Sequence, residues 1–295
     1  MIASTACIRR VRRAAPWAAA FAIAAAGAIA TACADDRRDA TARPARGGLR
    51  VVSLSPALSH SAIALGAAKA IVGRTPWCAA PDAPVVGSLT ERNLEAIAAL
   101  RPTLVLRQSS LPDPALAELC ASLGAQLYER HLNSLADVKD MVRSLGQALE
   151  AGGCAGAAGA AAAVLDRHAT EVERRVGGGP TLFLFSADPP SAFGSGTFVD
   201  GLWSAMGGTN AVLAEGYPVL SAEDVVRLRP ERVLLLGAPA SPAWMAALGT
   251  ACALPNATPL LEPGVAMLVD GPTLLRAACG GGPASAPEAA EEATP

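Results

Sequence analysis

Hydrophobic and polar residues follow a pattern along this chain that occurs twice. Residues 95–106 read EAIAALRPTLVL and residues 223–234 read EDVVRLRPERVL, 128 positions later. Each copy has apolar residues at helical spacing and then a proline, which ends the helix because it lacks the N–H that an interior position requires. The apolar run after each proline is typical of a buried parallel strand. The repeat therefore predicts two related α/β halves rather than one undivided sheet.

Strands and helices alternate in the first half. Short apolar runs predict strands at residues 50–54, 71–73, 103–106 and 126–128. Helical periodicity predicts helices at residues 59–65, 95–100, 116–123 and 134–150. This alternation predicts parallel pairing with helical crossovers, so we expect an N-terminal α/β lobe over residues 49–150.

An alanine-rich helix is predicted between the two copies of the repeat. It runs over residues 155–176 and stops at a Gly-Gly-Gly-Pro sequence, and we interpret residues 151–178 as the connection between two lobes. A second α/β lobe then occupies residues 179–280, with strands at 181–185 and 233–236 and helices near 198–206, 223–228 and 273–278. Because one helix is stiffer than several strand crossovers, we expect the lobes to shift only modestly around a ligand.

The ends of the chain have the features of an export signal and of low-complexity sequence. Residues 1–33 combine four arginines with an uncharged, Ala-rich stretch that ends at Cys33, which predicts a secretory signal, although an uncleaved anchor is the alternative. Residues 34–48 are charged and Pro/Gly-rich and predict a flexible tether. Residues 281–295 are acidic and low in complexity, and we expect no structure there.

Composition narrows the class of function. With 295 residues, 52% of them hydrophobic, the chain is long enough for two cores. The net charge of −2 and the lack of a basic stripe disfavour nucleic acid as a partner. Three scattered histidines disfavour a bare-metal site, and no cofactor is expected. No nucleophile or phosphate-loop motif is present, so we expect no enzyme activity, with an envelope enzyme as the less favoured alternative.

The order of several short motifs resembles a known family. The fragments RVVSLSPA, IVGRTPWCAAP, NLEAIAALRPTLVL, FSADPPSAFGSG, MGGTNAV and LSAEDVVRLRPERVLLL resemble the substrate-binding proteins of bacterial ABC importers, and among them most of all the vitamin B12-binding proteins. The resemblance extends from about Leu49 to Cys279 and implies a class III periplasmic binding protein. Such a protein has two Rossmann-like lobes with central parallel sheets, joined by a single long helix.

The resemblance also implies a function and partners. We expect a receptor in the periplasm or cell envelope that captures cobalamin or a related corrinoid between its lobes and delivers it to an ABC permease dimer. Haem or a ferric siderophore is the alternative ligand. The sequence around Cys33 resembles the lipobox of bacterial lipoproteins, so a lipid anchor in the membrane is expected as well, whereas plain cleavage of the signal is the alternative.

Two acidic residues are candidates for docking onto the permease. Glu95 and Glu223 match the acids that in this family contact arginines of the membrane subunits. One acid on each lobe suits a symmetric permease dimer. The alternative is local, because Asn93 and Ser221 look like N-caps and a glutamate in the first helical turn is favoured by the helix dipole.

The ligand-binding residues implied by the resemblance lie in two segments, one in each lobe. They are Trp77, Ser55 and Pro56 in the first lobe and Asp188, Pro189, Pro190 and Phe193 in the second. Trp77 offers a flat apolar face to a planar ligand, although it is also suited to a core. Ser55 suits either ligand contact or helix capping. The Asp-Pro-Pro turn and Phe193 suit either a cleft loop or a stiff, packed turn.

This chain departs from the vitamin B12-binding pattern at three positions. Leu89 and Gln108 stand where those proteins have further aromatic residues, and His60 stands where the wider family commonly has glutamate. An imidazole can coordinate cobalt or iron, but a lone histidine is more often a surface residue. We therefore expect no metal site, with ligation by His60 as the alternative.

Five cysteines follow Cys33, and an oxidising compartment permits disulfides among them. The pairings within a lobe are Cys78 with Cys120 and Cys252 with Cys279, which leaves Cys154 over. Spacing alone does not decide either pairing.

Overall fold

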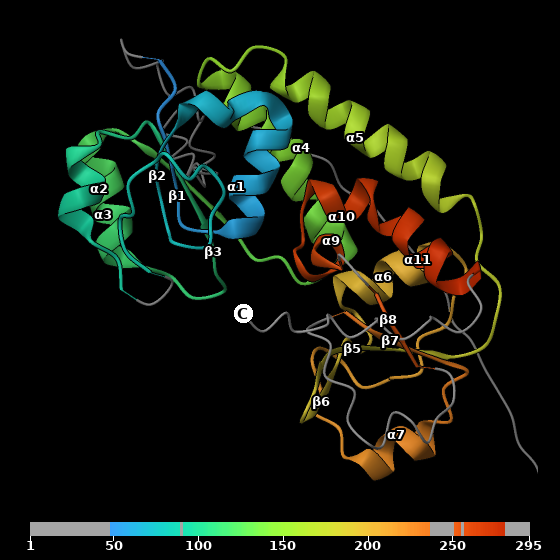
Figure 1. Cartoon of the computed structure of the whole chain (residues 1–295). Coiled ribbons are helices and arrows are strands. Elements are labelled where there is room, and N and C mark those ends of the chain that lie inside the picture. Colours follow the sequence, from blue (N-terminus) through green and yellow to red (C-terminus); the bar gives the residue numbers. More distant parts are fainter. Residues whose placement is uncertain (1–47, 89–90, 237–250, 255–256, 281–295) are drawn as a thin grey trace, which may run out of the picture. The chain divides into compact units, whose positions relative to one another are not determined.

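The computed structural model describes residues 48–88, 91–236, 251–254 and 257–280 (Figure 1). The signal segment with Cys33, the tether except Gly48, Leu89 and the tail at 281–295 lie outside the described residues. Within the part of the chain that the structure describes, no helix has both the length and the apolar composition needed to cross a bilayer.

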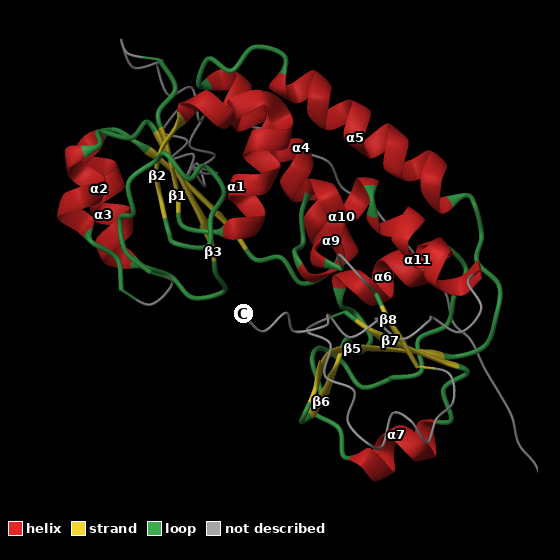
Figure 2. Ribbon diagram, viewed as in Figure 1, coloured by secondary structure: helices red, strands yellow, loops and turns green. Residues whose placement is uncertain are grey.

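The first half of the chain forms an all-parallel sheet with strand order β2-β1-β3-β4 (Figure 2). Its strands are β1 (Val51–Ser53), β2 (Ile71–Arg74), β3 (Leu104–Gln108) and β4 (Gln126–Arg130). Its α-helices are α1 (Pro56–Ala62), α2 (Leu94–Ala99), α3 (Pro114–Leu123) and α4 (Leu135–Ala151). Each strand predicted for this half coincides with an observed one, so the predicted alternation of strands and helices is confirmed.

Helix α1 begins earlier than the hydrophobic pattern suggests. It starts at Pro56 rather than near residue 59 because Ser55 caps it, with the Leu58 N–H donating to Ser55 Oγ at 3.3 Å. A proline at the first helical position sacrifices no hydrogen bond. The chain continues through a π turn and a 3-10 turn, and Gly66 takes a φ of 97° there, close to the end predicted for the helix.

The second half forms a mixed sheet with strand order β6-β5-β7-β8. Its strands are β5 (Thr181–Ala187), β6 (Pro190–Ala192), β7 (Arg232–Leu235) and β8 (Ala251–Ala253), and only the β5–β6 pairing is antiparallel. Its described helices are α6 (Phe198–Ala205), α7 (Ala222–Leu228), α9 (Thr258–Leu261), α10 (Val265–Val269) and α11 (Gly271–Gly280). The sequence pattern does not predict β6, β8, α9 or α10, because elements of three to five residues carry too little periodicity.

The repeated sequence motif gives the same local structure twice. Asn93 caps α2 by accepting from the Ala96 N–H, and Ser221 caps α7 by accepting from the Asp224 N–H. Arg101 and Arg229, each just before a proline, both have a φ of 46°. This left-handed conformation terminates the helix and turns the chain towards the next strand. The two helix ends predicted from the prolines are therefore confirmed.

Successive residues of the central strands face opposite layers. In β1, Val51 and Val52 belong to different clusters of buried side chains, and in β5 the same holds for Phe183 and Leu184. On one face, α2 and α3 cover the first sheet and α7 covers the second. The remaining faces of both sheets belong to a single cluster. Helices α2 and α7 therefore cover the sheet faces that lie away from this shared core.

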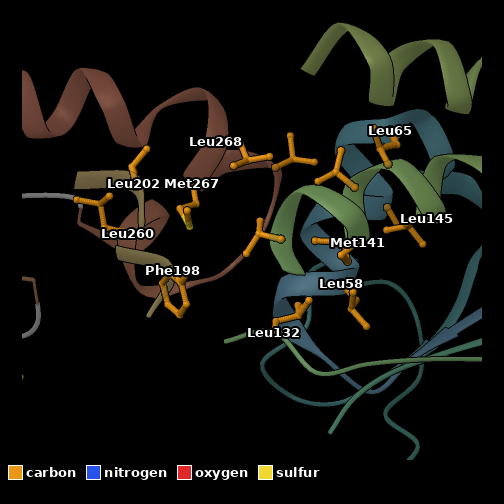
Figure 3. Close-up of a cluster of buried hydrophobic side chains, with 14 of the residues drawn as sticks. Leu58, Leu65, Leu132, Met141, Leu145, Phe198, Leu202, Leu260, Met267 and Leu268 are labelled. Atoms are coloured by element: carbon orange, nitrogen blue, oxygen red, sulfur yellow. The ribbon is translucent and has the colours of Figure 1, made fainter. Parts of the chain in front are cut away.

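Figure 3 shows side chains of both halves in this shared core. Its labelled members include Leu58, Met141 and Leu145 from the first half and Phe198, Leu202 and Leu268 from the second. Helix α4 packs on α6, and α1 packs on α10. The two halves are thus joined by a continuous apolar interface as well as by the predicted helix.

The connecting helix α5 (Ala157–Val172) packs closely on α4. A Cβ atom at Gly146 of α4 would lie 2.6 Å from the Cβ of Ala161 and 2.9 Å from the carbonyl oxygen of Ala157. A larger residue at either side of this contact would push the helices apart. The alanine-rich sequence of α5 is explained by this close approach, and α5 also packs on α10 and α11 of the second half.

His168 of α5 is buried against the second half. Its Nδ1 lies 3.1 Å from the carbonyl oxygen of Leu268, so a proton on Nδ1 completes a hydrogen bond between α5 and α10. Burial lowers the pKa of His168 below its ordinary value of 6.5, and Lys139 lowers it further, whereas the bond to Leu268 opposes the shift. The folded protein therefore favours the neutral imidazole.

Removal of a shared-core side chain should destabilise the whole molecule. We expect Leu268→Ala, at a fully buried position, to lower the free energy of unfolding by about 2–5 kcal/mol. Leu213→Ala, at a side chain 81% exposed, should change it by less than about 0.5 kcal/mol. Chemical denaturation followed by circular dichroism measures both. Two separate transitions, only one of them shifted by Leu268→Ala, would contradict a shared core.

Acid should weaken the fold through His168. Because its folded pKa is depressed, the unfolded chain binds the proton more readily, and this contribution to stability is present above about pH 6.5 and declines as the pH falls through that value. His168→Gln does not titrate. Its melting temperature should therefore fall less between about pH 7.5 and 5.5 than that of the wild type, as measured by calorimetry. An equal fall would show that His168 contributes nothing to the pH dependence.

Candidate functional site

A hollow of about 410 Å³ is lined by residues of both halves. Its lining residues are Gln108, Leu132, Phe185, Phe193, Phe198, Tyr217, Leu261 and Pro263. The volume lies within the range of about 300–1,000 Å³ that is usual for small-molecule sites. We call this hollow the interlobe pocket.

The interlobe pocket lies where the topology predicts a ligand site. Gln108 is the last residue of β3, and Leu132 follows β4 by two residues. Phe185 lies in the carboxyl-terminal part of β5. In α/β sheets, ligands bind outside the carboxyl ends of the strands, so these positions are suited to ligand contact.

Four aromatic rings of the second half form one wall of the interlobe pocket. Phe193 is at their centre, with ring centroids 5.1 Å from Phe185, 5.5 Å from Phe198 and 5.7 Å from Tyr217. Every pair is edge-to-face, the arrangement that ring quadrupoles favour. We call these four residues the aromatic wall. It offers a ligand a broad and rigid apolar surface.

Backbone hydrogen bonds hold the aromatic wall in place. The Gly194 N–H donates to the carbonyl oxygen of Gly216 at 2.8 Å, which places Phe193 and Tyr217 beside each other. A Cβ at Gly194 would lie 2.1 Å from the carbonyl oxygen of Ala214, so only glycine permits this approach. Asn210, in the MGGTNAV motif, donates to the carbonyl oxygen of Phe193 at 3.0 Å. This part of the motif therefore supports the wall.

The lining of the interlobe pocket is almost entirely uncharged and apolar. Among its described residues, only Gln108 and Tyr217 carry side-chain hydrogen-bonding groups. Burial raises the pKa of Tyr217, so its phenol stays protonated at neutral pH and is available as a donor. Gln108 Oε1 accepts from the hydroxyl of Ser55 at 3.0 Å. The site thus suits a largely apolar ligand with few polar contacts.

The residues predicted to bind ligand are divided between the interlobe pocket and other places. Phe193 lines the pocket, and Ser55 reaches it indirectly through Gln108 while also capping α1. Trp77 is 59% exposed on the loop after β2, so the alternative that it belongs to the core is wrong. Four predicted residues are not among the described lining residues of the pocket. They are Pro56 at the start of α1 and Asp188, Pro189 and Pro190 at the β5–β6 turn.

The two predicted docking residues are both exposed. Glu95 and Glu223 lie in the first turns of α2 and α7, and neither forms an ion pair with a described residue. Hydrogen bonds from Ser221 lower the pKa of the neighbouring Asp224, which closes a capping box. In α7 the capping box is therefore formed by Ser221 and Asp224, and Glu223 takes no part in it.

His60 does not lie in a cluster of metal ligands. Its Nδ1 is 2.7 Å from Glu262 Oε2, and within the described residues no group of three or more His, Cys, Asp or Glu side chains is placed to hold a metal ion. At His60 the described residues therefore provide fewer side-chain ligands than a bare ion usually takes from a protein.

The candidate pairing of Cys78 with Cys120 is not formed, because both are separate buried thiols. Cys78 Sγ lies 3.0 Å from Thr75 Oγ1, whereas Cys120 packs between α3 and the sheet. The side chain of Cys252 lies outside the described residues, so its predicted pairing with Cys279 stays a prediction.

Sequence reasoning missed Phe185, Phe198 and Tyr217. One available signal was the place of Phe185 near the carboxyl end of a predicted strand, where ligands bind in α/β folds. A second signal was the context of Tyr217, which lies between Gly216 and Pro218. Like Pro76 before Trp77, these neighbours are typical of a turn or loop. No local signal indicates that Phe185 and Tyr217, which are 32 positions apart in sequence, come together in the fold.

Comparisons with known proteins agree with this architecture. The family model described as periplasmic binding protein matches residues 51–244. Comparison with curated protein sequences finds no match. Among solved structures, the periplasmic haem-binding protein BhuT in complex with two haems is 24% identical with a TM-score of 0.60, and the match covers 79% of this chain and all of BhuT.

Two further solved structures have the same fold. The periplasmic haem-binding protein RhuT from Roseiflexus sp. RS-1 is 24% identical with a TM-score of 0.59, over 79% of this chain and 100% of RhuT. The periplasmic vitamin B12-binding protein BtuF of Vibrio cholerae is 22% identical with a TM-score of 0.60, over 79% of this chain and 99% of BtuF. The expected class III architecture, two α/β lobes and a connecting helix, is confirmed.

Proposed function

The chain belongs to the periplasmic binding protein family, and on that premise we propose that it captures a metal-centred tetrapyrrole, haem or a corrinoid such as cobalamin. The members of this family are solute-binding proteins of ABC importers rather than enzymes. The proposed partner is therefore the permease dimer of an importer, to which the loaded protein delivers its ligand. The proposed anchor in the membrane is a lipid on Cys33.

The aromatic wall is the observation that carries this proposal. Four of the chain's eleven Phe, Tyr and Trp residues surround one side of the interlobe pocket, although aromatic residues make up only 4% of the sequence. Aromatic side chains concentrated in this way suit a flat, conjugated ligand, which gains contact area over its whole face. Haem and cobalamin, the ligands of the structural neighbours BhuT and BtuF, both have such a face.

The polarity of the lining favours haem over a corrinoid. A corrin ring carries amide arms around its rim, and these need hydrogen-bonding partners when they are buried. The lining provides only Gln108 and Tyr217 for this purpose. The rim of haem is apolar except for two carboxylates on one edge. The sequence resemblance, by contrast, favours a corrinoid, so both ligands belong in the test.

A ferric siderophore fits the interlobe pocket less well. Ferric siderophores commonly carry polar or charged groups over most of their surface, whereas haem carries its two carboxylates on one edge, which can stay in solvent while the apolar face is buried. None of the eight described lining residues is charged. We therefore propose this ligand class only as the third in a titration with haemin, cyanocobalamin and a ferric siderophore.

Tyr217→Ala should weaken binding of the tetrapyrrole about tenfold, or about 1.4 kcal/mol, because it removes the half-exposed ring of the aromatic wall. Tyr217→Phe should bind within about threefold of the wild type if the ring provides the contact. Titration followed by absorption or tryptophan fluorescence measures each affinity. Leu213→Ala, on the same loop but outside the lining, is the control. Unchanged affinity in Tyr217→Ala would exclude the aromatic wall as the site.

Trp77 is tested in the same titration. The sequence predicts that it stacks on the ligand, and its exposed indole is available for this contact. On that basis Trp77→Ala also weakens binding about tenfold, with little change in stability. An affinity equal to that of the wild type would remove Trp77 from the site and leave the aromatic wall as the contact surface.

Docking by Glu95 and Glu223 is separable from ligand capture. We expect the double variant Glu95→Ala with Glu223→Ala to bind ligand normally but to abolish uptake, since both acids lie on the outer layers and outside the lining. The matched control replaces Glu118 and Glu173, which are exposed acids on α3 and after α5. Uptake into cells that carry the cognate permease is the measurement. Normal uptake by the Glu95/Glu223 variant would remove the docking role.

A further inference from the structure

The side chains of His60 and Glu262 contact each other between the two halves of the chain. His60 lies on α1, and Glu262 directly follows α9, 202 positions later, with 2.7 Å between Nδ1 and Oε2. The His60 side chain is 47% exposed, while its neighbours Ser59 and Ser61 are buried. The imidazole therefore points away from the shared core and into solvent-accessible space.

Neither His60 nor Glu262 is a lining residue of the interlobe pocket, but Glu262 is adjacent to it in the chain. Glu262 is flanked in sequence by Leu261 and Pro263, and both of these residues line the pocket. The start of α1 is linked to the pocket as well, because its N-cap Ser55 donates a hydrogen bond to the lining residue Gln108. Helix α1 is thus linked to the pocket through its N-cap, and His60 faces outward one turn after the start of the helix.

Glu262 determines which ring nitrogen of His60 is available. A carboxylate only accepts hydrogen bonds, so the proton of a neutral imidazole resides on Nδ1 and the lone pair remains on Nε2. No described residue forms a hydrogen bond with Nε2. A histidine whose second nitrogen is held by a carboxylate is the usual arrangement of a metal-ligating imidazole.

One histidine is sufficient only for a metal that brings most of its own ligands. A bare ion needs several converging side chains, and the described residues offer no such group at His60. The metal in a tetrapyrrole already has four in-plane nitrogen ligands and lacks only axial ones. We propose that His60 Nε2 is an axial ligand of the metal in the bound tetrapyrrole and that Glu262 orients it. This inference rests on the proposed function.

A purely structural role for the His60–Glu262 contact has less support. The same two segments are already joined by a buried hydrogen bond, in which the Val265 N–H donates to Ser61 Oγ at 3.2 Å. A Cβ at Gly264 would lie 2.7 Å from Ser61 Oγ, so the backbones are also closely packed there. A half-exposed ion pair adds little stability, about 0–1 kcal/mol, to a contact of this kind. His60 is therefore dispensable for the fold.

Comparison of a metal-containing ligand with its metal-free form tests the proposal. In His60→Ala we expect the affinity for haemin to fall at least tenfold and the Soret band to shift, while the affinity for metal-free protoporphyrin IX stays within about twofold of the wild type. Added imidazole should restore the wild-type Soret band by filling the vacated position. Glu262→Gln should give a smaller loss for haemin. His131→Ala, at an exposed histidine outside the lining, is the matched control.

The outcomes separate the two proposals. A Soret band and haemin affinity unchanged in His60→Ala would overturn axial ligation and leave the proposed function intact. An equal loss for haemin and protoporphyrin IX would also overturn it, since the side chain would then act only through packing. If wild-type protein binds none of haemin, protoporphyrin IX and cyanocobalamin, the proposed function fails and the axial ligand with it.

Discussion

The apolar interface between the two halves is the interaction on which the rest of the structure depends. Helices α1 and α4 of the first half and the connecting helix α5 pack on α6, α10 and α11 of the second half, and their side chains form one continuous core. Because the interlobe pocket takes lining residues from both halves, the geometry of this core sets the pocket's width. Leu132 and Phe198 belong to both, and Figure 3 shows each of them along the lower side of the cluster.

Some residues of the aromatic wall support the fold, whereas others are available for contact with a ligand. Phe193 and Phe198 are buried members of the shared core, so they support the fold whether or not a ligand is present. Tyr217 packs on the same rings but is half-exposed, so its free face is available to a ligand. A wall built on the core is rigid, and a rigid surface loses little conformational entropy on binding.

Close backbone contacts between distant segments of the chain make the site possible. Gly194 and Gly264 each lie where a Cβ atom would collide with a neighbouring segment, Gly194 beside the aromatic wall and Gly264 beside α1. Both glycines let two distant segments approach closely enough to bring side chains together, Tyr217 to Phe193 in one case and Glu262 to His60 in the other. These close contacts join chain positions that are far apart in sequence, so no local sequence pattern predicts them.

The sequence by itself determined the longer helices and strands and their alternation. The repeated Leu-Arg-Pro motif, the caps at Asn93 and Ser221 and the apolar strands act over a few residues, and short-range steric and hydrogen-bonding preferences decide them. Only the tertiary structure decided which side chains meet. It gathered Phe185, Phe193 and Tyr217 into one wall, paired His60 with Glu262 and kept Cys78 apart from Cys120. These contacts follow from how the halves pack, which is a property of the whole core rather than of any segment.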